Sequence, residues 1–213
     1  MPVSTLHEPP KPQSATVLNL PNALTMSRLV LAVVLFVLLA WEYFRSSFVV
    51  FSIAASTDWL DGYLARKRGE TTVLGRILDP FVDKVVVIGA FIFLMPVPEA
   101  GLAAWMVTVV VARELLVTGL RSYLEGESIA FGADWMGKVK MGLQCVALSC
   151  VLFYIGFLLG PIASTFGSWG GEAIAWGEWI SRTMTWSAVL VTALSGVSYC
   201  WRAIRLVRER RAG

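Results

Sequence analysis

Long apolar stretches alternate with short polar segments along most of the chain. A helix needs about 20 consecutive, mostly apolar residues to cross the hydrocarbon core of a bilayer. Six stretches come close to that length, at approximately residues 27–44, 47–65, 79–97, 101–121, 138–160 and 183–206. Because open sheet edges are not stable in hydrocarbon, each stretch is predicted to form a helix. The pattern therefore predicts an all-α integral membrane protein, a bundle of six transmembrane helices.

The N-terminal segment has a different character. Residues 1–16, MPVSTLHEPPKPQSAT, are polar and rich in proline, with no apolar stretch before a cleavage site, so no signal peptide is expected. Residues 17–25 are more apolar and are predicted to form a short juxtamembrane helix. We expect residues 1–24 to be the N-terminal tail and juxtamembrane segment, and residues 25–208 to be one membrane domain.

Composition agrees with the membrane class and narrows the chemistry. Hydrophobic residues make up 56% of the chain and charged residues only 15%, which is outside the range of ordinary soluble domains. A net charge of +3 gives no support for a nucleic-acid partner. His7, in the proline-rich tail, is the single histidine, which excludes a histidine metal site or a catalytic triad.

Lysines and arginines are distributed unevenly between the predicted loops. If the N-terminus is cytoplasmic, fourteen of them lie at the cytoplasmic face and only Arg45 and Arg182 lie at the other. Positive charge accumulates on the cytoplasmic side of membrane proteins. Both termini are therefore predicted on the cytoplasmic side of the inner membrane.

Four aspartates lie where the second and third predicted helices approach the same membrane surface. Asp58 and Asp61 are three residues apart and Asp79 and Asp83 are four apart, so each pair shares a helix face. Such residues can simply face water, but four adjoining carboxylates repel one another unless cations compensate them. An all-oxygen ligand set suits Mg²⁺ or Mn²⁺ better than Zn²⁺. The spacing therefore predicts a divalent-metal site.

The small residues between the two aspartate pairs complete a longer pattern. Gly62, Ala65 and Gly75 would let a phosphate approach the backbone closely. The full pattern D-x2-D-G-x2-A-R-x8-G-x3-D-x3-D resembles the signature of the CDP-alcohol phosphotransferases. Its eight fixed positions are filled here by Asp58, Asp61, Gly62, Ala65, Arg66, Gly75, Asp79 and Asp83.

The resemblance implies a six-helix membrane enzyme that is a homodimer and holds two Mg²⁺ or Mn²⁺ ions in each active site, at the cytoplasmic side. The implied metal ligands are Asp58, Asp61, Asp79 and Asp83. Asp83 is also implied to act as the general base on the attacking hydroxyl. The implied CDP-binding residues are Asn22, Thr25, Asp61, Gly62, Ala65, Arg66 and Gly75.

Charged residues within and next to the later apolar stretches are candidates for binding an anionic acceptor. Arg113 and Glu114 lie inside the fourth stretch, where they can form a self-compensating salt bridge or serve a function. Arg121 lies two helical turns beyond Arg113, on the same face. Lys138 and Lys140 open the fifth stretch and can either snorkel to the interface or join the arginines. Together these four cations could bind a phosphomonoester.

The same segments resemble the phosphatidylglycerophosphate synthases among the CDP-alcohol phosphotransferases. The similar stretches are Leu20-Pro21-Asn22-x-x-Thr25-x-x-Arg28, Arg113-Glu114-x-x-x-Thr-Gly-x-Arg121 and Gly137-Lys138-x-Lys140. The last departs from the family form at Met141, where a threonine is usual. The resemblance implies transfer of a phosphatidyl group from CDP-diacylglycerol to sn-glycerol 3-phosphate within the lipid bilayer.

Two other interpretations remain open. One is an enzyme of the same family with inositol phosphate, phosphatidylglycerol or serine as its acceptor. The other is a metal-ion channel or transporter, in which the aspartates line a cation pathway.

Overall fold

The computed structural model describes residues 20–68, 73–127, 135–160 and 170–212, except for the side chains of residues 20–25, 58–68, 73–80, 83, 211 and 212. Six α-helices follow one another in this part of the chain: α1 (Leu20–Ala40), α2 (Phe44–Arg68), α3 (Val73–Leu94), α4 (Ala104–Gly126), α5 (Trp135–Phe153) and α6 (Gly170–Ala212). A 3-10 helix, η1 (Pro98–Ala100), precedes α4, and a π-helix, η2 (Tyr154–Leu158), continues α5. The described residues contain no strand.

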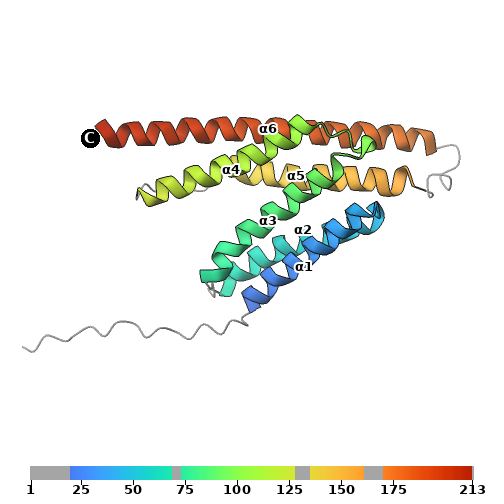
Figure 1. Ribbon diagram of the computed structural model, residues 1–213, viewed down its shortest axis with the longest axis horizontal. Helices are drawn as coiled ribbons and strands as arrows, with labels where there is room; N and C mark the ends of the chain where they lie inside the picture. The colour runs from blue at the N-terminus through green and yellow to red at the C-terminus, as the bar shows by residue number, and fades with distance from the viewer. Residues whose placement is uncertain (1–19, 69–72, 128–134, 161–169, 213) are drawn as a thin grey trace, which may run out of the picture.

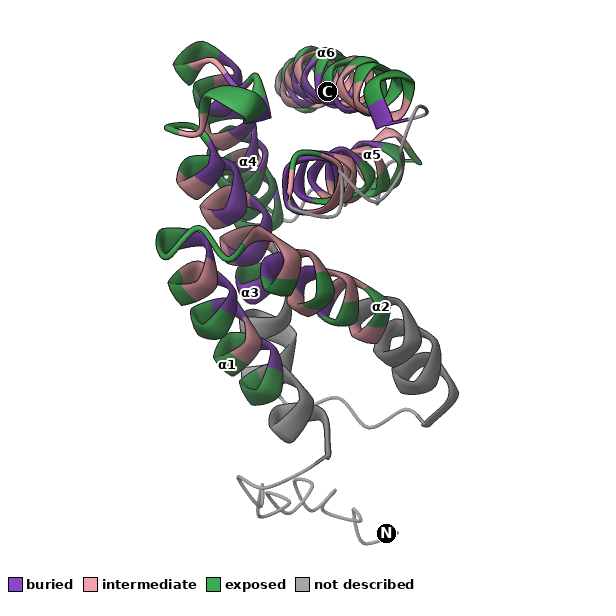
Figure 2. Ribbon diagram, turned by 90° about the vertical axis from the view of Figure 1, so that its right-hand side faces the viewer, coloured by how far each residue is buried: buried purple, intermediate pink, exposed green. Residues whose placement is uncertain are grey.

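The helices form two groups that share contacts. In one, α1 packs against α2 and α3, and in the other, α6 packs against α4 and α5. Contacts of α2 with α5, and of α3 with α4 and α5, join the two groups (Figure 1). Buried residues lie on the sides of the helices that face one another, and exposed residues cover the outer sides (Figure 2).

Large apolar side chains fill the space between the helices. Leu35 of α1, Phe51 of α2, Phe91 of α3, and Leu148 and Leu152 of α5 are at most 1% exposed. When lipid tails surround a bundle, exclusion of water from these contacts gives little stabilisation. The close packing of side chains therefore stabilises the fold mainly through van der Waals attraction.

The outer surface is also apolar. Side chains such as Trp176, Trp179, Leu190, Val197 and Trp201 are exposed along the length of α6. Within the described part of the chain, Trp135–Leu158 and Gly170–Arg210 are long and apolar enough to cross a membrane, while Met26–Ala40 and Lys84–Leu94 are shorter apolar helices. Soluble proteins rarely expose so much apolar surface. An all-helical fold with such an exterior is consistent with a membrane protein.

The expectation that each apolar stretch forms a helix is confirmed, since every one of the six coincides with one α-helix. The expectation of a separate juxtamembrane helix is wrong for residues 20–25, because α1 begins at Leu20 and continues to Ala40 without a break. Residues 161–182 lie between the fifth and sixth predicted stretches, yet the end of this segment is also helical, because α6 begins at Gly170. Its first turns contain Glu178 and Arg182, whose carboxylate and guanidinium groups pair at 2.7 Å with i,i+4 spacing. These charges lower the local hydropathy without opposing a helix.

A close contact between α2 and η2 accompanies the π-helix. The side chain of Arg45, in the first turn of α2, donates a 2.7 Å hydrogen bond from Nε to the carbonyl oxygen of Gly156. The Arg45 guanidinium carbon lies 5.8 Å from the centre of the Phe157 ring. A Cβ atom at position 156 would lie 2.9 Å from the Arg45 backbone nitrogen, so only glycine allows this approach.

Replacing Gly156 with alanine is expected to destabilise the protein by about 1–3 kcal/mol, because the added methyl group would press on backbone atoms that cannot move independently. Thermal unfolding of the detergent-purified protein measures the change. The matched control is Gly142→Ala in α5, where a Cβ atom meets nothing within 4 Å. This control should unfold at or above the wild-type temperature, because alanine favours a helix over glycine by up to about 1 kcal/mol. Equal unfolding temperatures for the two variants would contradict the close-contact explanation.

Candidate functional site

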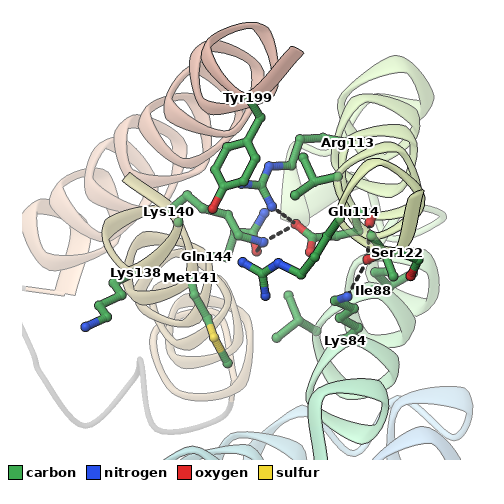
Figure 3. A pocket seen from close by; sticks show the side chains of 15 residues that line it. Lys84, Ile88, Arg113, Glu114, Ser122, Lys138, Lys140, Met141, Gln144 and Tyr199 are labelled. Carbon is green, nitrogen blue, oxygen red and sulfur yellow. Dashed lines mark hydrogen bonds and ion pairs between the residues drawn. The ribbon is translucent and has the colours of Figure 1, made fainter. Parts of the chain in front are cut away.

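A cavity of about 370 Å³ lies between α3, α4, α5 and α6 (Figure 3). It is located where α4 ends and α5 begins, with α3 contributing its middle turns and α6 its C-terminal half. The residues that line it are Lys84, Val87, Ile88, Arg113, Glu114, Val117, Thr118, Arg121, Ser122, Gly137, Lys138, Lys140, Met141, Gln144 and Tyr199. All four cations predicted to bind the acceptor are among them.

The lining of the cavity is strongly positive. Its charged residues are five cations and one carboxylate, that of Glu114, which leaves four positive charges in formal excess. Cations at this depth in an apolar bundle are costly unless they have partners or bind an anion. The cavity is therefore suited to a small ligand with negative charge.

The deepest charges form a buried cluster of three side chains. Arg113 is 7% exposed and donates a 3.2 Å hydrogen bond from Nη1 to Oε1 of Glu114, and the Lys140 ammonium, 6% exposed by residue, donates to the same oxygen. Figure 3 shows both cations converging on this carboxylate from α4 and α5. The salt bridge considered as an alternative for Arg113 therefore exists. Glu114 balances only one of its two cationic neighbours, however, so the cluster keeps a net positive charge.

Arg113 also has contacts on α6 that its sequence pattern did not predict. Its Nη2 donates a 2.6 Å hydrogen bond to Oγ of Ser195, and its guanidinium carbon lies 5.3 Å from the centre of the Tyr199 ring. At Gly196, an added Cβ atom would lie 3.1 Å from Cγ of Arg113. The α6 backbone thus approaches the arginine closely. Arg113 Nε is buried and has no hydrogen-bond partner in the part of the chain that the structure describes.

The remaining cations lie nearer the opening of the cavity. Arg121 and Lys138 are exposed, and the Lys138 side chain points away from Glu114 in Figure 3. Exposure of Lys138 agrees with the snorkelling alternative, whereas burial of Lys140 does not. Lys84 of α3 donates a hydrogen bond to the Thr118 hydroxyl, which itself donates at 2.7 Å to the carbonyl oxygen of Glu114. Lys84 is thus a fifth cation of the site, in addition to the four predicted to bind the acceptor.

The predicted metal and CDP ligands lie on α1, α2 and α3, of which α3 lines this cavity, but their side chains are outside the described residues. Asp58, Asp61, Gly62, Ala65 and Arg66 are in the second half of α2; Gly75, Asp79 and Asp83 are in the first half of α3; Asn22 and Thr25 are in the first turns of α1. Only residues 69–72 connect α2 to α3, which keeps Arg68 and Val73 within about 18 Å of each other.

Position along α3 relates the aspartates to the cavity. Asp83 directly precedes Lys84, and Val87, which also lines the cavity, is one helical turn further along. Because α3 rises 1.5 Å per residue, Asp83 and Val87 are only about 6 Å apart along the helix axis.

Among the side chains that the structure describes, no group of three or more His, Cys, Asp or Glu residues could hold a metal ion. Metal binding by the four aspartates therefore stays a prediction.

Comparison with known proteins identifies the family. The sequence profile of the CDP-alcohol phosphatidyltransferases matches residues 18–194, which includes both aspartate pairs and most of the cavity lining. A Bacillus subtilis (strain 168) protein named CDP-diacylglycerol–glycerol-3-phosphate 3-phosphatidyltransferase is 36% identical over 64% of this chain and 77% of its own length. Proteins of the same name from Shigella flexneri serotype 5b (strain 8401) and Salmonella choleraesuis (strain SC-B67) are 32% and 34% identical, each over 71% of this chain and 90% of the relative. The chain therefore belongs to the CDP-alcohol phosphatidyltransferase family.

Proposed function

We propose that this protein transfers the phosphatidyl group of CDP-diacylglycerol to sn-glycerol 3-phosphate, giving phosphatidylglycerophosphate and CMP in phospholipid biosynthesis. The observation that carries the proposal is the cavity that gathers Arg113, Arg121, Lys138 and Lys140 beside the helix that contains Asp83. The names of the relatives support the same donor and acceptor.

The acceptor's phosphate fits the charge and the depth of the cavity. A phosphomonoester carries up to two negative charges and three strong acceptor oxygens, which match forked guanidinium donors and ammonium groups. Arg113 still has a buried Nε–H to offer, and the cations exceed the single carboxylate. A neutral acceptor such as serine or free glycerol would leave that excess charge without compensation.

The aspartates suit the metal that the family implies. Asp58 and Asp61 near the end of α2, with Asp79 and Asp83 near the start of α3, offer carboxylate oxygens on two helices joined by a short connection. This donor chemistry fits two Mg²⁺ or Mn²⁺ ions better than zinc. Such ions, when bound, neutralise the diphosphate and the departing CMP. Gly62, Ala65, Arg66 and Gly75, with Asn22 and Thr25 of α1, would line the CDP site.

The remaining chemistry belongs to the protein's own side chains. Asp83 would accept the proton of the acceptor's primary hydroxyl, whose oxygen forms a bond to the phosphorus that bears the diacylglycerol. The bond from that phosphorus to the CMP oxygen breaks, and CMP leaves with the electron pair. The cations of the cavity hold the acceptor's own phosphate, which orients the hydroxyl towards α3. Holding the two reactants in this arrangement replaces a bimolecular encounter by an oriented one.

The placement in the membrane follows from the same proposal. All six helices would cross the bilayer, with both termini and the opening of the cavity on the cytoplasmic side, where lysine and arginine accumulate. Substrate lipid would then enter from the bilayer and the acceptor from the cytoplasm. Two copies of the chain would form a homodimer.

The direct test is release of CMP from CDP-diacylglycerol by the purified protein across a panel of acceptors. Glycerol 3-phosphate should support release, and chelation of divalent cations should stop it until Mg²⁺ or Mn²⁺ is restored. Release with inositol phosphate, phosphatidylglycerol or serine in its place would reassign the acceptor within the family. Transport of Mg²⁺ into vesicles without any CMP release would support the channel or transporter instead.

Replacing Arg113 with alanine is expected to raise KM for glycerol 3-phosphate by about 10- to 100-fold, the loss expected for a charged hydrogen-bond donor, with little change in KM for CDP-diacylglycerol. The Glu114–Lys140 pair remains neutral in this variant, so the fold should be retained. Initial rates with each substrate varied in turn measure both constants. Arg182→Ala, which removes an exposed arginine paired with Glu178, is the matched control and should leave both unchanged. Equal increases in both constants for Arg113→Ala would assign Arg113 a structural role only.

A further inference from the structure

A chain of hydrogen bonds, closed into a ring by the α6 helix, lies at the buried end of the cavity. Its members are Arg113 and Glu114 of α4, Lys140 and Gln144 of α5, and Thr192 and Ser195 of α6. Going around the ring, Ser195 accepts from Arg113, Arg113 and Lys140 both donate to Glu114, Lys140 donates to Gln144, and Gln144 donates to Thr192. Thr192 and Ser195 are three residues apart on one face of α6, so the helix itself closes the ring.

The two hydrogen bonds of Gln144 are compatible with only one orientation of its side-chain amide. Its Oε1 accepts from the Lys140 ammonium at 3.4 Å, and its Nε2 donates to Oγ1 of Thr192 at 2.9 Å. The reversed amide would place its NH₂ group against an ammonium, which cannot accept a hydrogen bond. The Lys140 ammonium therefore selects the orientation of the amide, and the Thr192 hydroxyl, by accepting from Nε2, holds the Gln144 side chain in place beside Lys140.

The two α6 residues differ from the rest of the ring in one respect. Arg113, Glu114, Lys140 and Gln144 line the cavity, but Thr192 and Ser195 do not. Both hydroxyl-bearing residues are fully buried, at 0% exposure. An acceptor in the cavity would contact the cations, while α6 would act on it only through them.

We propose that Thr192 and Ser195 are positioning residues for the acceptor: α6 orients Lys140 and Arg113 through the ring and so sets the affinity for the acceptor's phosphate. This inference rests on the proposed function for the identity of the acceptor. The physical reason is that a long cationic side chain has many rotamers, and fixing them before binding reduces the entropy lost when the phosphate is bound. Loss of one hydrogen bond of the ring also leaves a buried donor without an acceptor, which favours other rotamers of the cationic side chains.

A third buried hydroxyl on α6 provides a matched control. Thr185 lies seven residues before Thr192 and is 1% exposed, and its Oγ1 has no hydrogen-bond partner in the described part of the chain. Replacing a threonine with valine removes the hydroxyl and preserves the shape at either position. The two substitutions therefore differ in whether the lost hydroxyl belongs to the ring.

Thr192→Val is expected to raise KM and Kd for glycerol 3-phosphate about 5- to 10-fold, and Ser195→Ala, which leaves a charged donor without its acceptor, about 10- to 30-fold. In both variants kcat and KM for CDP-diacylglycerol should change little. Thr192→Ser, which keeps the hydroxyl, should restore near wild-type constants. Thr185→Val should match the wild type throughout. The constants come from initial rates and from calorimetric titration of glycerol 3-phosphate into purified protein, with thermal unfolding measured for every variant.

The calorimetric arm separates this inference from the proposed function. If the wild type binds glycerol 3-phosphate but releases no CMP, the proposed reaction fails, and the Kd values of the variants still test the ring. If Thr192→Val and Thr185→Val show the same KM and Kd for the acceptor, the positioning role of α6 is wrong although the enzyme is active. A parallel fall in kcat, in affinity for both substrates and in unfolding temperature would also overturn it, because that result indicates general loosening of the bundle.

Discussion

The Asp83→Asn variant is expected to lose turnover by about 10³-fold, within the usual contribution of a general base, with a much smaller loss of CDP-diacylglycerol binding. The amide has nearly the same shape as the carboxylate, but it cannot take the proton of the acceptor's hydroxyl. The other three aspartates remain to bind metal and CDP-diacylglycerol. Single-turnover CMP release, with direct binding of the lipid substrate, separates the two effects.

The comparison variants for this experiment are Asp58→Asn and Asp79→Asn, which should weaken metal-dependent binding of the lipid as well as turnover. Glu125→Gln supplies the control, because Glu125 is an exposed acidic residue of α4 that does not line the cavity. It should retain wild-type rates. Near-normal turnover of Asp83→Asn would remove Asp83 from the role of base, whatever its part in binding metal.

Replacing Glu114 with alanine should destabilise the protein by about 3–5 kcal/mol, the usual cost of leaving buried charge without its partner. Arg113 and Lys140 would then be adjacent cations with no carboxylate between them. Their repulsion should also displace both from the positions that bind the acceptor. We expect a lower unfolding temperature, measured in detergent, and a raised KM for glycerol 3-phosphate.

A double variant shows whether the destabilisation of Glu114→Ala comes from lost charge balance or from lost packing. Combining Glu114→Gln with Lys140→Met removes one negative and one positive charge while keeping similar volumes, so most of the stability should return without recovery of acceptor affinity. The two single variants complete a double-mutant cycle. Glu178→Ala, which breaks an exposed pair, should cost no more than about 1 kcal/mol. Wild-type stability of Glu114→Ala would show that the carboxylate is not needed to balance its neighbours.

The helices could be predicted from the sequence because bilayer thickness imposes a minimum apolar length that soluble proteins seldom reach. Their ends could not be predicted as well, because a helix continues past the hydrocarbon wherever side chains permit. The first turns of α6 are the clearest case. Glu178 and Arg182 reduce the apolar character of that segment, yet their i,i+4 pairing supports a helix there.

The cations of the candidate site could be predicted, since a charge within an apolar stretch is itself unusual. The contribution of α6 could not. Hydroxyl residues are common in apolar helices, where they often bond to their own backbone, as Thr183 does to the carbonyl oxygen of Trp179. Nothing in the sequence distinguishes Thr183 from Thr192, whose hydroxyl accepts from another helix. That difference depends on how α5 and α6 pack.

The length of α6 links the site to the bilayer around it. Trp179 and Trp201 are both exposed and are 22 positions apart, which is about 33 Å along a helix. Tryptophan prefers the headgroup level, so in the proposed placement this interval matches the hydrocarbon thickness. Tyr199, in the cavity wall, lies only two residues before the second of these anchors. Hydrophobic mismatch in a thicker or thinner bilayer would tilt this helix, and the depth of the cavity mouth below the headgroups would change with lipid composition.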